Sequence, residues 1–229
     1  MRATVKQFAA AALLVCGLAG ALSVAAQSVQ ITDARGAQVQ LAKPPQRIVS
    51  LLPSLTESLC ALGGCERLVG VDRYSNWPAH VKTVPVVGGG LDPNIEAIVA
   101  LKPDLVLVSM ASRAIARMEG LGLKVVALEP RTHEEARTVM QKIGQLLALP
   151  PTQGADRVWA AIEADLNKAA ASVPEAMRGQ RVYFEASRGP YAAGEKSFIG
   201  QTLTRLHLRN VVDARQGPFP RLNPEYVVK

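Results

Sequence analysis

One segment, residues 94–109, constrains the fold class more than any other part of this chain. The sequence NIEAIVALKPDLVLVS places apolar residues at helical spacing up to Leu101 and then changes, within a few residues, to an unbroken apolar run. Asn94 is suited to cap the helix, and Pro103 ends it because proline lacks an N–H and disfavours helical geometry in the residue before it. Residues 105–108 are apolar on both faces, as a strand of a parallel sheet covered by helices must be. The segment predicts an α/β fold.

The same alternation of strand and helix continues on both sides of this segment. A β-hairpin is expected within residues 27–46, because apolar and polar residues alternate around a glycine turn. Further strands are expected at residues 47–52, 68–71 and 124–128, and further helices at residues 53–62, 111–119 and 133–148. Ser54 followed by Glu57 predicts a capping box at the first of these helices. Residues 47–150 are therefore predicted to form an N-terminal lobe with a mainly parallel sheet.

A long helix is predicted to follow this lobe. Pro150 and Pro151 form a sharp boundary, and residues 151–174 then contain one uninterrupted, alanine-rich helical run. At about 1.5 Å per residue such a helix spans about 30 Å, the width of a small domain. Residues 175–229 begin a second lobe with a strand at 181–185 and a helix at 198–207. The predicted fold is two α/β lobes joined by a single long helix, with the second lobe incomplete in this chain.

The first 26 residues are typical of a secretory signal peptide. Arg2 and Lys6 provide the positive start, an apolar run follows, and small residues precede the expected cleavage point after residue 26. A lipoprotein anchor on Cys16 is disfavoured by the bulky Val15 before it. No other apolar run reaches the length of about 18 residues that a membrane span needs. We expect a periplasmic protein.

The net charge of +7 does not indicate a nucleic-acid partner. Two of these charges, on Arg2 and Lys6, belong to the predicted leader, and the remaining basic residues are scattered along the chain. A nucleic-acid surface would need them clustered on one face. We therefore expect no nucleic-acid binding.

The cysteine and histidine pattern does not predict a metal site. Cys60 and Cys65 are expected to form a disulfide in an exported protein, with two free or buried thiols as the alternative. Nearby residues supply no third or fourth metal ligand. His80, His133 and His207 are far apart in sequence, and each is interpreted as a surface residue.

No motif of an enzyme is present in the sequence. The chain lacks the GxSxG motif of hydrolases, the HExxH motif of zinc peptidases and the P-loop of nucleotide-binding proteins. The glycines at 88–90 lack the following spacing and lysine of a phosphate cradle. The sequence thus favours a binding protein over an enzyme.

Several motifs, taken in order, resemble one family. These are RIVSLLPSLTE (47–57), RLVGVDRYSNWP (67–78), NIEAIVALKPDLVLV (94–108), GPYAAGEKSFIGQTL (189–203) and FPRLNPEYV (219–227). Together they resemble the periplasmic substrate-binding proteins of ABC importers for cobalamin, haem and iron-siderophores, in which two α/β lobes are joined by one long helix. The cobalamin binders are the most similar subfamily, because VGV precedes a Tyr-Ser-x-aromatic-Pro loop. Members of the family continue beyond the point that matches Lys229.

The resemblance implies that a ligand lies between the lobes, held mostly by aromatic side chains. Tyr74 matches a position that lines the cleft, Tyr191 matches its partner in the second lobe, and Phe219 stands where a cleft tryptophan occurs. Trp77 follows Tyr74 in the same loop and is a further candidate. Aromatic rings are physically suited to a wide, flat, mainly apolar ligand. Gly90 departs from the cobalamin binders, which carry tryptophan there.

The resemblance also implies partners. Glu96 and Glu225 match the surface glutamates that pair with arginines of the membrane permease. The leading hypothesis is a monomeric receptor that has no intrinsic cofactor and delivers a cobalt corrinoid, a tetrapyrrole-like ligand, to an ABC permease and its ATPase. A haem or ferric-siderophore receptor is the alternative, with Tyr74 or Tyr191 as an iron ligand. A third hypothesis is an envelope sensor or scaffold without a transport role.

Overall fold

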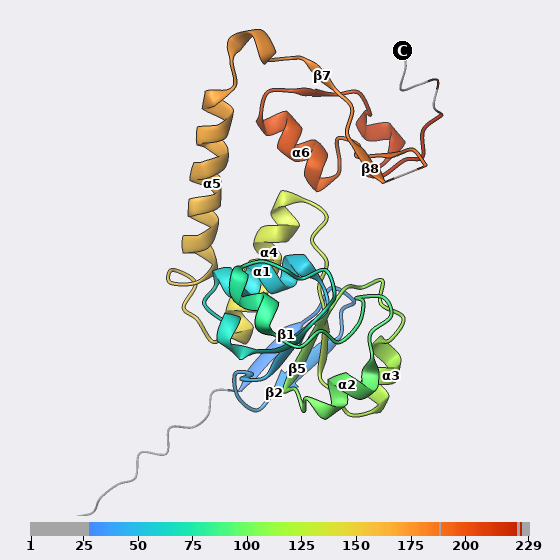
Figure 1. The fold of residues 1–229 in the computed structure, drawn as a ribbon. Helices are drawn as coiled ribbons and strands as arrows, with labels where there is room; N and C mark the ends of the chain where they lie inside the picture. Colours follow the sequence, from blue (N-terminus) through green and yellow to red (C-terminus); the bar gives the residue numbers. More distant parts are fainter. Residues whose placement is uncertain (1–27, 188, 224, 226–229) are drawn as a thin grey trace, which may run out of the picture.

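The computed structural model describes residues 28–187, 189–223 and 225, which form two lobes joined by one long helix (Figure 1). Helix α5 (Ala155–Ser172) runs from the first lobe to the second, smaller one. The predicted architecture is confirmed. Among the residues described, no helix is both long enough and apolar enough to cross a membrane. The predicted leader and Cys16 lie outside the described residues.

The first lobe is built on a four-stranded parallel sheet. Its strand order is β4-β3-β5-β6, so the chain crosses over between neighbouring strands. The strands are β3 (Ile48–Ser50), β4 (Leu68–Val71), β5 (Leu105–Val108) and β6 (Val125–Ala127). All four residues of β5 are buried, as predicted for a strand with both faces covered.

Helices cover the two faces of this sheet. They are α1 (Pro53–Ala61), α2 (Ile95–Ala100), α3 (Ile115–Gly120) and α4 (His133–Leu146). Leu105 and Leu107 of β5 point into a core shared with α1 and α4, whereas Val106 and Val108 point into a second core with α2 and α3. Successive side chains of β5 thus point to opposite faces of the sheet, with α1 and α4 on one face and α2 and α3 on the other.

The cap of one helix and the start of another differ from the sequence prediction. Helix α1 begins at Pro53 with Leu52 as its N-cap, and no side chain caps it. Ser54 therefore lies inside the helix, and the predicted capping box is wrong. Helix α3 begins at Ile115 rather than at residue 111. Before it, the hydroxyl oxygens of Ser109 and Ser112 accept backbone N–H groups two residues ahead, a local bonding pattern that competes with a helical turn.

The junction between α2 and β5 follows the prediction. The side chain of Asn94 accepts the N–H of Ala97 at 2.9 Å and caps α2. Lys102 adopts a left-handed conformation, with φ of 47°, so the chain leaves the helix directly before Pro103. Asp104 then accepts two backbone N–H groups, those of Gln46 at 2.8 Å and Arg47 at 2.9 Å. These bonds fix the entry into β5.

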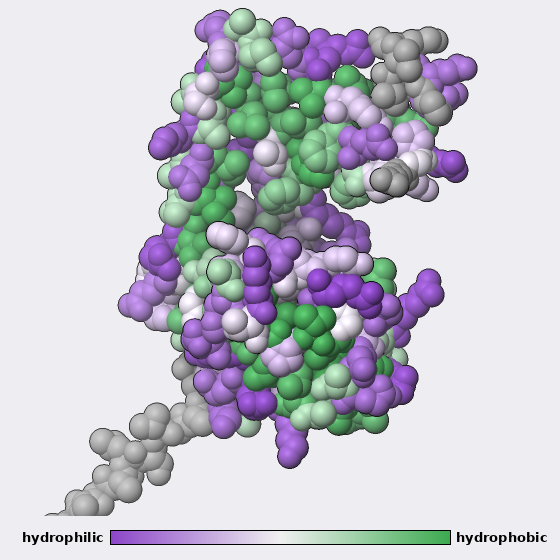
Figure 2. Space-filling view, viewed as in Figure 1, coloured by the Kyte–Doolittle hydropathy of each residue, from purple (hydrophilic) through white to green (hydrophobic). Residues whose placement is uncertain are grey.

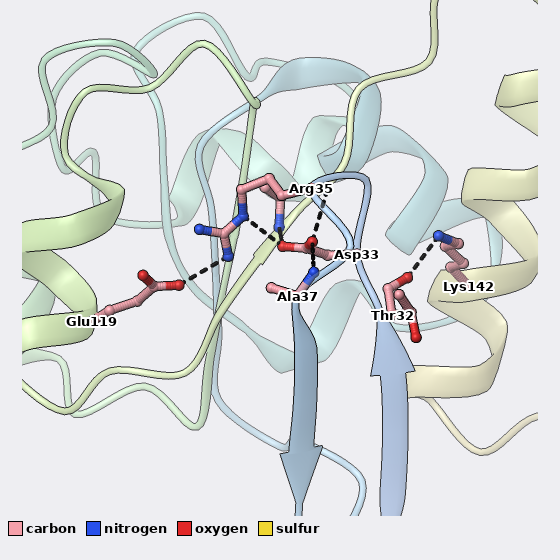
Figure 3. Close-up of polar contacts among 7 residues, drawn as sticks. Thr32, Asp33, Arg35, Ala37, Glu119 and Lys142 are labelled. Atoms are coloured by element: carbon pink, nitrogen blue, oxygen red, sulfur yellow. Dashed lines mark hydrogen bonds and ion pairs between the residues drawn. The ribbon is translucent and has the colours of Figure 1, made fainter.

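The N-terminal hairpin, β1 (Val29–Thr32) and β2 (Gln38–Leu41), is tied to the first lobe through Asp33 (Figure 3). The Asp33 carboxylate accepts Arg35 Nε at 2.8 Å and the N–H of Ala127, at the end of β6, at 3.2 Å. Arg35 also donates to Glu119 at 2.9 Å. Burial alone raises the pKa of Asp33, but the hydrogen bonds from Arg35 and from backbone N–H groups outweigh it and hold that pKa below its usual value.

The described part of the second lobe contains two small sheets and one α-helix. Strand β7 (Arg181–Val182) pairs in parallel with β10 (Arg209–Asn210), and β8 (Glu185–Ser187) pairs antiparallel with β9 (Tyr191–Ala192). The single strand expected over residues 181–185 is therefore divided between two sheets. Helix α6 (Phe198–Arg205) is capped by the Ser197 side chain and stops two residues earlier than predicted.

Candidate ligand-binding cleft

Polar side chains gather where the strands of the first lobe end. Ser50 closes β3, Asp72 follows β4 and Ser109 follows β5, and all three are buried. Ser109 donates to the carboxylate of Glu129, beyond β6, at 2.8 Å. In open α/β sheets, ligands bind outside this carboxyl edge of the strands. Side chains at this edge are therefore hydrogen-bonded to neighbouring side chains.

The buried network at this edge fixes the loop that carries Tyr74. Asp72 accepts the N–H of Tyr74 at 2.9 Å and the hydroxyl of Ser75. Thr56 of α1 bonds Ser75 at 2.9 Å and Ser50 at 2.8 Å, so the loop is tied to both a strand and a helix. The Tyr74 side chain itself is 66 % exposed. A large aromatic ring is thereby held in solvent by an anchored backbone.

In the second lobe, Tyr191 and Phe219 lie on adjacent segments. Tyr191 forms a bridge with Arg221, and the N–H of Ala192 bonds the carbonyl of Pro220 at 3.0 Å. The segment that contains Phe219 therefore runs beside β9. Both rings are roughly half exposed, at 41 % for Tyr191 and 49 % for Phe219.

The structure gives a steric reason for glycine at position 90. A Cβ atom added to Gly90 would collide with the backbone carbonyl oxygen of Leu51, directly after β3. The turn at residues 88–93 therefore lies against the carboxyl edge of the sheet.

A cavity of about 690 Å³ lies between the lobes, next to α5. Figure 2 shows the molecule hollowed between its two lobes, with apolar surface along the inner side of α5. Of the four residues predicted to bind ligand, all in the described part of the chain, Trp77 lines this cavity, whereas Tyr74, Tyr191 and Phe219 do not.

Sequence reasoning missed two aromatic residues that line this cavity, Trp159 on α5 and Phe198 on α6. A signal for Trp159 was present: Trp159, Ile162 and Leu166 follow helical spacing and share one face of α5. Phe198 carries no such signal, because it comes directly after the helix cap.

Polar contacts of α6 join the second lobe to α4 of the first lobe and to the connecting helix α5. His133, the first residue of α4, donates its N–H to Gln201 at 2.8 Å, and its Nε2 lies 2.9 Å from the hydroxyl of Thr202. Arg205 of α6 binds Glu163 of α5 at 2.7 Å. His133 is 9 % exposed, so its interpretation as a surface histidine is wrong. Burial, reinforced by the charge of Arg205, lowers the pKa of His133.

The remaining predicted residues lie on the surface or at a helix end. Glu96, in the first turn of α2, forms an exposed ion pair with Arg117 at 3.1 Å. Glu225 is also exposed, and its N–H bonds the side chain of Asn223 at 3.0 Å. Cys60 and Cys65 form a disulfide that closes the C-terminal end of α1. Within the described ranges, no cluster of three or more histidines, cysteines or carboxylates is suited to a metal ion.

Comparison with known proteins places this architecture in a family. The chain is 30 % identical to the uncharacterized ABC transporter substrate-binding lipoprotein YvrC of Bacillus subtilis, over 88 % of this chain and 66 % of the relative. It is also 30 % identical to the vitamin B12-binding protein of Salmonella typhimurium, over 80 % of this chain and 68 % of that protein. A periplasmic heme-binding protein of Pseudomonas aeruginosa has a similar structure, with a TM-score of 0.69 at 26 % identity, covering 80 % of this chain and 68 % of its own.

The chain spans between 54 % and 68 % of the length of the curated relatives it matches. The sequence pattern of the periplasmic binding proteins covers residues 48–229, which is most of the chain. This protein therefore belongs to the periplasmic binding protein family.

Proposed function

We propose that this protein captures a corrinoid between its two lobes and delivers it to an ABC permease and its ATPase. The observation that carries the proposal is the placement of exposed aromatic rings: Tyr74 stands on an anchored loop at the carboxyl edge of the first lobe, and Tyr191 with Phe219 stands in the second. Aromatic faces suit a wide ring system because they contribute large contact area at low entropic cost. The similarity to vitamin B12-binding proteins supports the same ligand class.

The role we infer is that of a periplasmic receptor rather than of an enzyme. The predicted leader at residues 1–26 agrees with export, and the relative YvrC is named a lipoprotein, so an anchored form is compatible with the family. The protein acts as a monomer in this proposal, with the ligand as its cargo and no resident cofactor.

Titration of the purified chain with cyanocobalamin, followed by calorimetry, tests the corrinoid proposal. We expect binding of one ligand per chain with a dissociation constant in the micromolar range or below, because aromatic contacts bury much apolar area. Absence of heat with cyanocobalamin, for a chain whose circular dichroism is that of a folded protein, would reject the corrinoid.

A haem receptor is the second candidate, and two observations favour it. The structure resembles a heme-binding protein, and the exposed Tyr74 and Tyr191 provide hydroxyl groups of the kind that ligate haem iron. Haemin added to the same preparation distinguishes the two: a Soret band shift that is lost in Tyr74→Phe or Tyr191→Phe assigns haem. If neither ligand binds, the envelope scaffold hypothesis gains support.

A further inference from the structure

Three arginines gather at the end of the second lobe that lies farthest from the first lobe. Arg181 begins β7, Arg209 begins β10, Arg178 precedes β7 by a short turn, and all three are exposed. The N–H of Arg209 donates to the carbonyl of Gln180 at 2.9 Å, so the backbone holds the two segments together. Figure 1 places this end beyond the C-terminal end of α5, and Figure 2 shows hydrophilic residues along it.

Two of these arginines are direct neighbours in a sheet. Arg181 and Arg209 are register partners in the parallel pair of β7 and β10. Neighbouring strands lie about 4.8 Å apart, and the side chains of partner residues leave the sheet on the same face. Like charges in such positions destabilise a sheet. A bound anion would remove this repulsion, so the pair favours an anionic partner.

The protein itself provides no carboxylate to neutralise this charge. Among the residues that the structure describes, no acidic side chain forms an ion pair with Arg178, Arg181 or Arg209. Glu175, in the short 3-10 helix η3 (Glu175–Met177), is close in sequence but does not pair with them. Other arginines do pair with carboxylates, namely Arg35, Arg73, Arg117, Arg137, Arg205 and Arg215. The charge at this end of the lobe is thus available to a partner.

An exposed apolar side chain lies beside these charges. Met177 ends η3, is 50 % exposed and directly precedes Arg178, whose Nε donates to the carbonyl of Val173 at 3.4 Å. A free phosphate ion would use the guanidinium groups alone, because it offers nothing for the Met177 side chain to contact. An anionic phospholipid surface offers both, since its phosphates attract arginine and the boundary below them accepts an apolar side chain.

We propose that this arginine edge, formed by Met177, Arg178, Arg181 and Arg209, binds the surface of an anionic phospholipid membrane. The guanidinium groups lie among the lipid phosphates, and Met177 enters the headgroup boundary. Each arginine strengthens such binding about fivefold, so three together give about a hundredfold preference for anionic lipid. The contact is weak and reversible, and it requires neither a cleft ligand nor a permease.

Co-sedimentation with lipid vesicles tests the membrane contact. The exported protein is purified without its predicted leader, and mass spectrometry verifies its N-terminus, because an attached apolar leader would itself enter lipid. We expect binding to vesicles of dioleoylphosphatidylglycerol and at least about tenfold weaker binding to vesicles of dioleoylphosphatidylcholine, which carry no net charge. Raised salt should weaken the binding to the anionic vesicles.

Two arginine variants with the same loss of net charge locate the contact. Replacing Arg181 and Arg209 together by glutamine should weaken binding to the anionic vesicles about 25-fold. Replacing Arg113 and Arg157 together by glutamine removes two exposed arginines elsewhere and is the matched control, which should bind like the wild type. Thermal unfolding followed by circular dichroism confirms that each variant is folded.

A second pair of variants tests the apolar part of the contact. Met177→Ser should weaken binding to the anionic vesicles at least about threefold, because an apolar side chain no longer leaves water. Leu121→Ser removes a comparably exposed apolar side chain from the first lobe and should have no effect.

The outcomes distinguish a membrane from other anionic partners. Equal binding to the two kinds of vesicle, or an equal loss in the two arginine variants, overturns the proposal. Full release from the vesicles by inorganic phosphate, relative to chloride at the same ionic strength, would assign a free anion instead. Release by poly-glutamate together with unchanged binding of Met177→Ser would assign an acidic protein and likewise overturn it. Since the vesicles contain no permease and no corrinoid, none of these results depends on the proposed transport function.

Discussion

At the scale of single residues, Asp72 shows how a buried carboxylate positions an exposed aromatic ring. Its two oxygens hold the backbone of Tyr74 and the hydroxyl of Ser75, while the ring of Tyr74 stays in solvent. Hydrogen bonds within the first lobe therefore offset the conformational entropy that is lost when this loop is ordered. A ligand that binds there finds the ring already in place, which reduces the entropic cost of binding.

Removing either predicted aromatic contact should weaken ligand binding. We expect Tyr74→Ala and Tyr191→Ala each to lower the affinity for cyanocobalamin by about 1–3 kcal/mol, the scale of a lost aromatic contact. Calorimetric titration measures the change, and Leu121→Ala, an exposed residue at the end of α3, is the matched control. Unchanged affinity in both tyrosine variants would place the ligand elsewhere on the molecule.

At the scale of elements, the sequence predicted those segments in which local chemistry decides the structure. The helix capped by Asn94 and the strand β5 were predicted closely, because a cap, a proline and an apolar run act within a few residues. The start of α3 was missed, since serine side chains replaced the expected helical bonds. Phe198 and His133 were missed as cavity residues because their partners come from another lobe, far away in sequence.

The contact between the hairpin and the sheet should make stability depend on pH. Because the pKa of Asp33 is lowered in the folded state, its contribution is fully present above the unfolded value of about 3.9 and is lost as the pH falls through the folded value. Asp33→Asn should reduce the free energy of unfolding at pH 7 by about 1–3 kcal/mol.

Urea unfolding at pH 7 and at pH 3 measures this effect. The difference between the wild type and Asp33→Asn should shrink at the lower pH, because protonation of Asp33 in the unfolded chain there removes part of the stability that its lowered folded-state pKa provides. Asp165→Asn, on the exposed surface of α5, is the control and should match the wild type at both values. A difference that stays constant with pH would contradict the assigned role of the Asp33 charge.

At the scale of the whole molecule, we predict that Glu96 and Glu225 dock the receptor on its permease. The combined reversal Glu96→Arg and Glu225→Arg should leave cyanocobalamin affinity intact but weaken permease association at least about tenfold, because exposed charges steer and orient encounter. Binding to the permease in lipid nanodiscs measures this, and raised salt should weaken the wild-type complex in the same direction.

Two controls address the local effects of charge reversal. Glu96→Gln removes the ion pair with Arg117 without placing two cations side by side, and Glu134→Arg reverses another exposed glutamate in the first turn of a helix, α4. Normal import by the variant with both charges reversed would contradict the docking role. Both glutamates would then act only through local electrostatics at the start of a helix. Loss of import in Glu134→Arg as well would indicate a general sensitivity to surface charge.

The contacts of His133 have a kinetic consequence. Because they join α4 of the first lobe to α6 of the second in addition to α5, we predict that ligand capture requires no large closing motion before the contacts form. Association should then be limited by diffusion and orientation, with similar rates for related ligands. Discrimination between ligands would reside in how long each one stays bound. In the proposed role, that dwell time sets the interval available for meeting a permease.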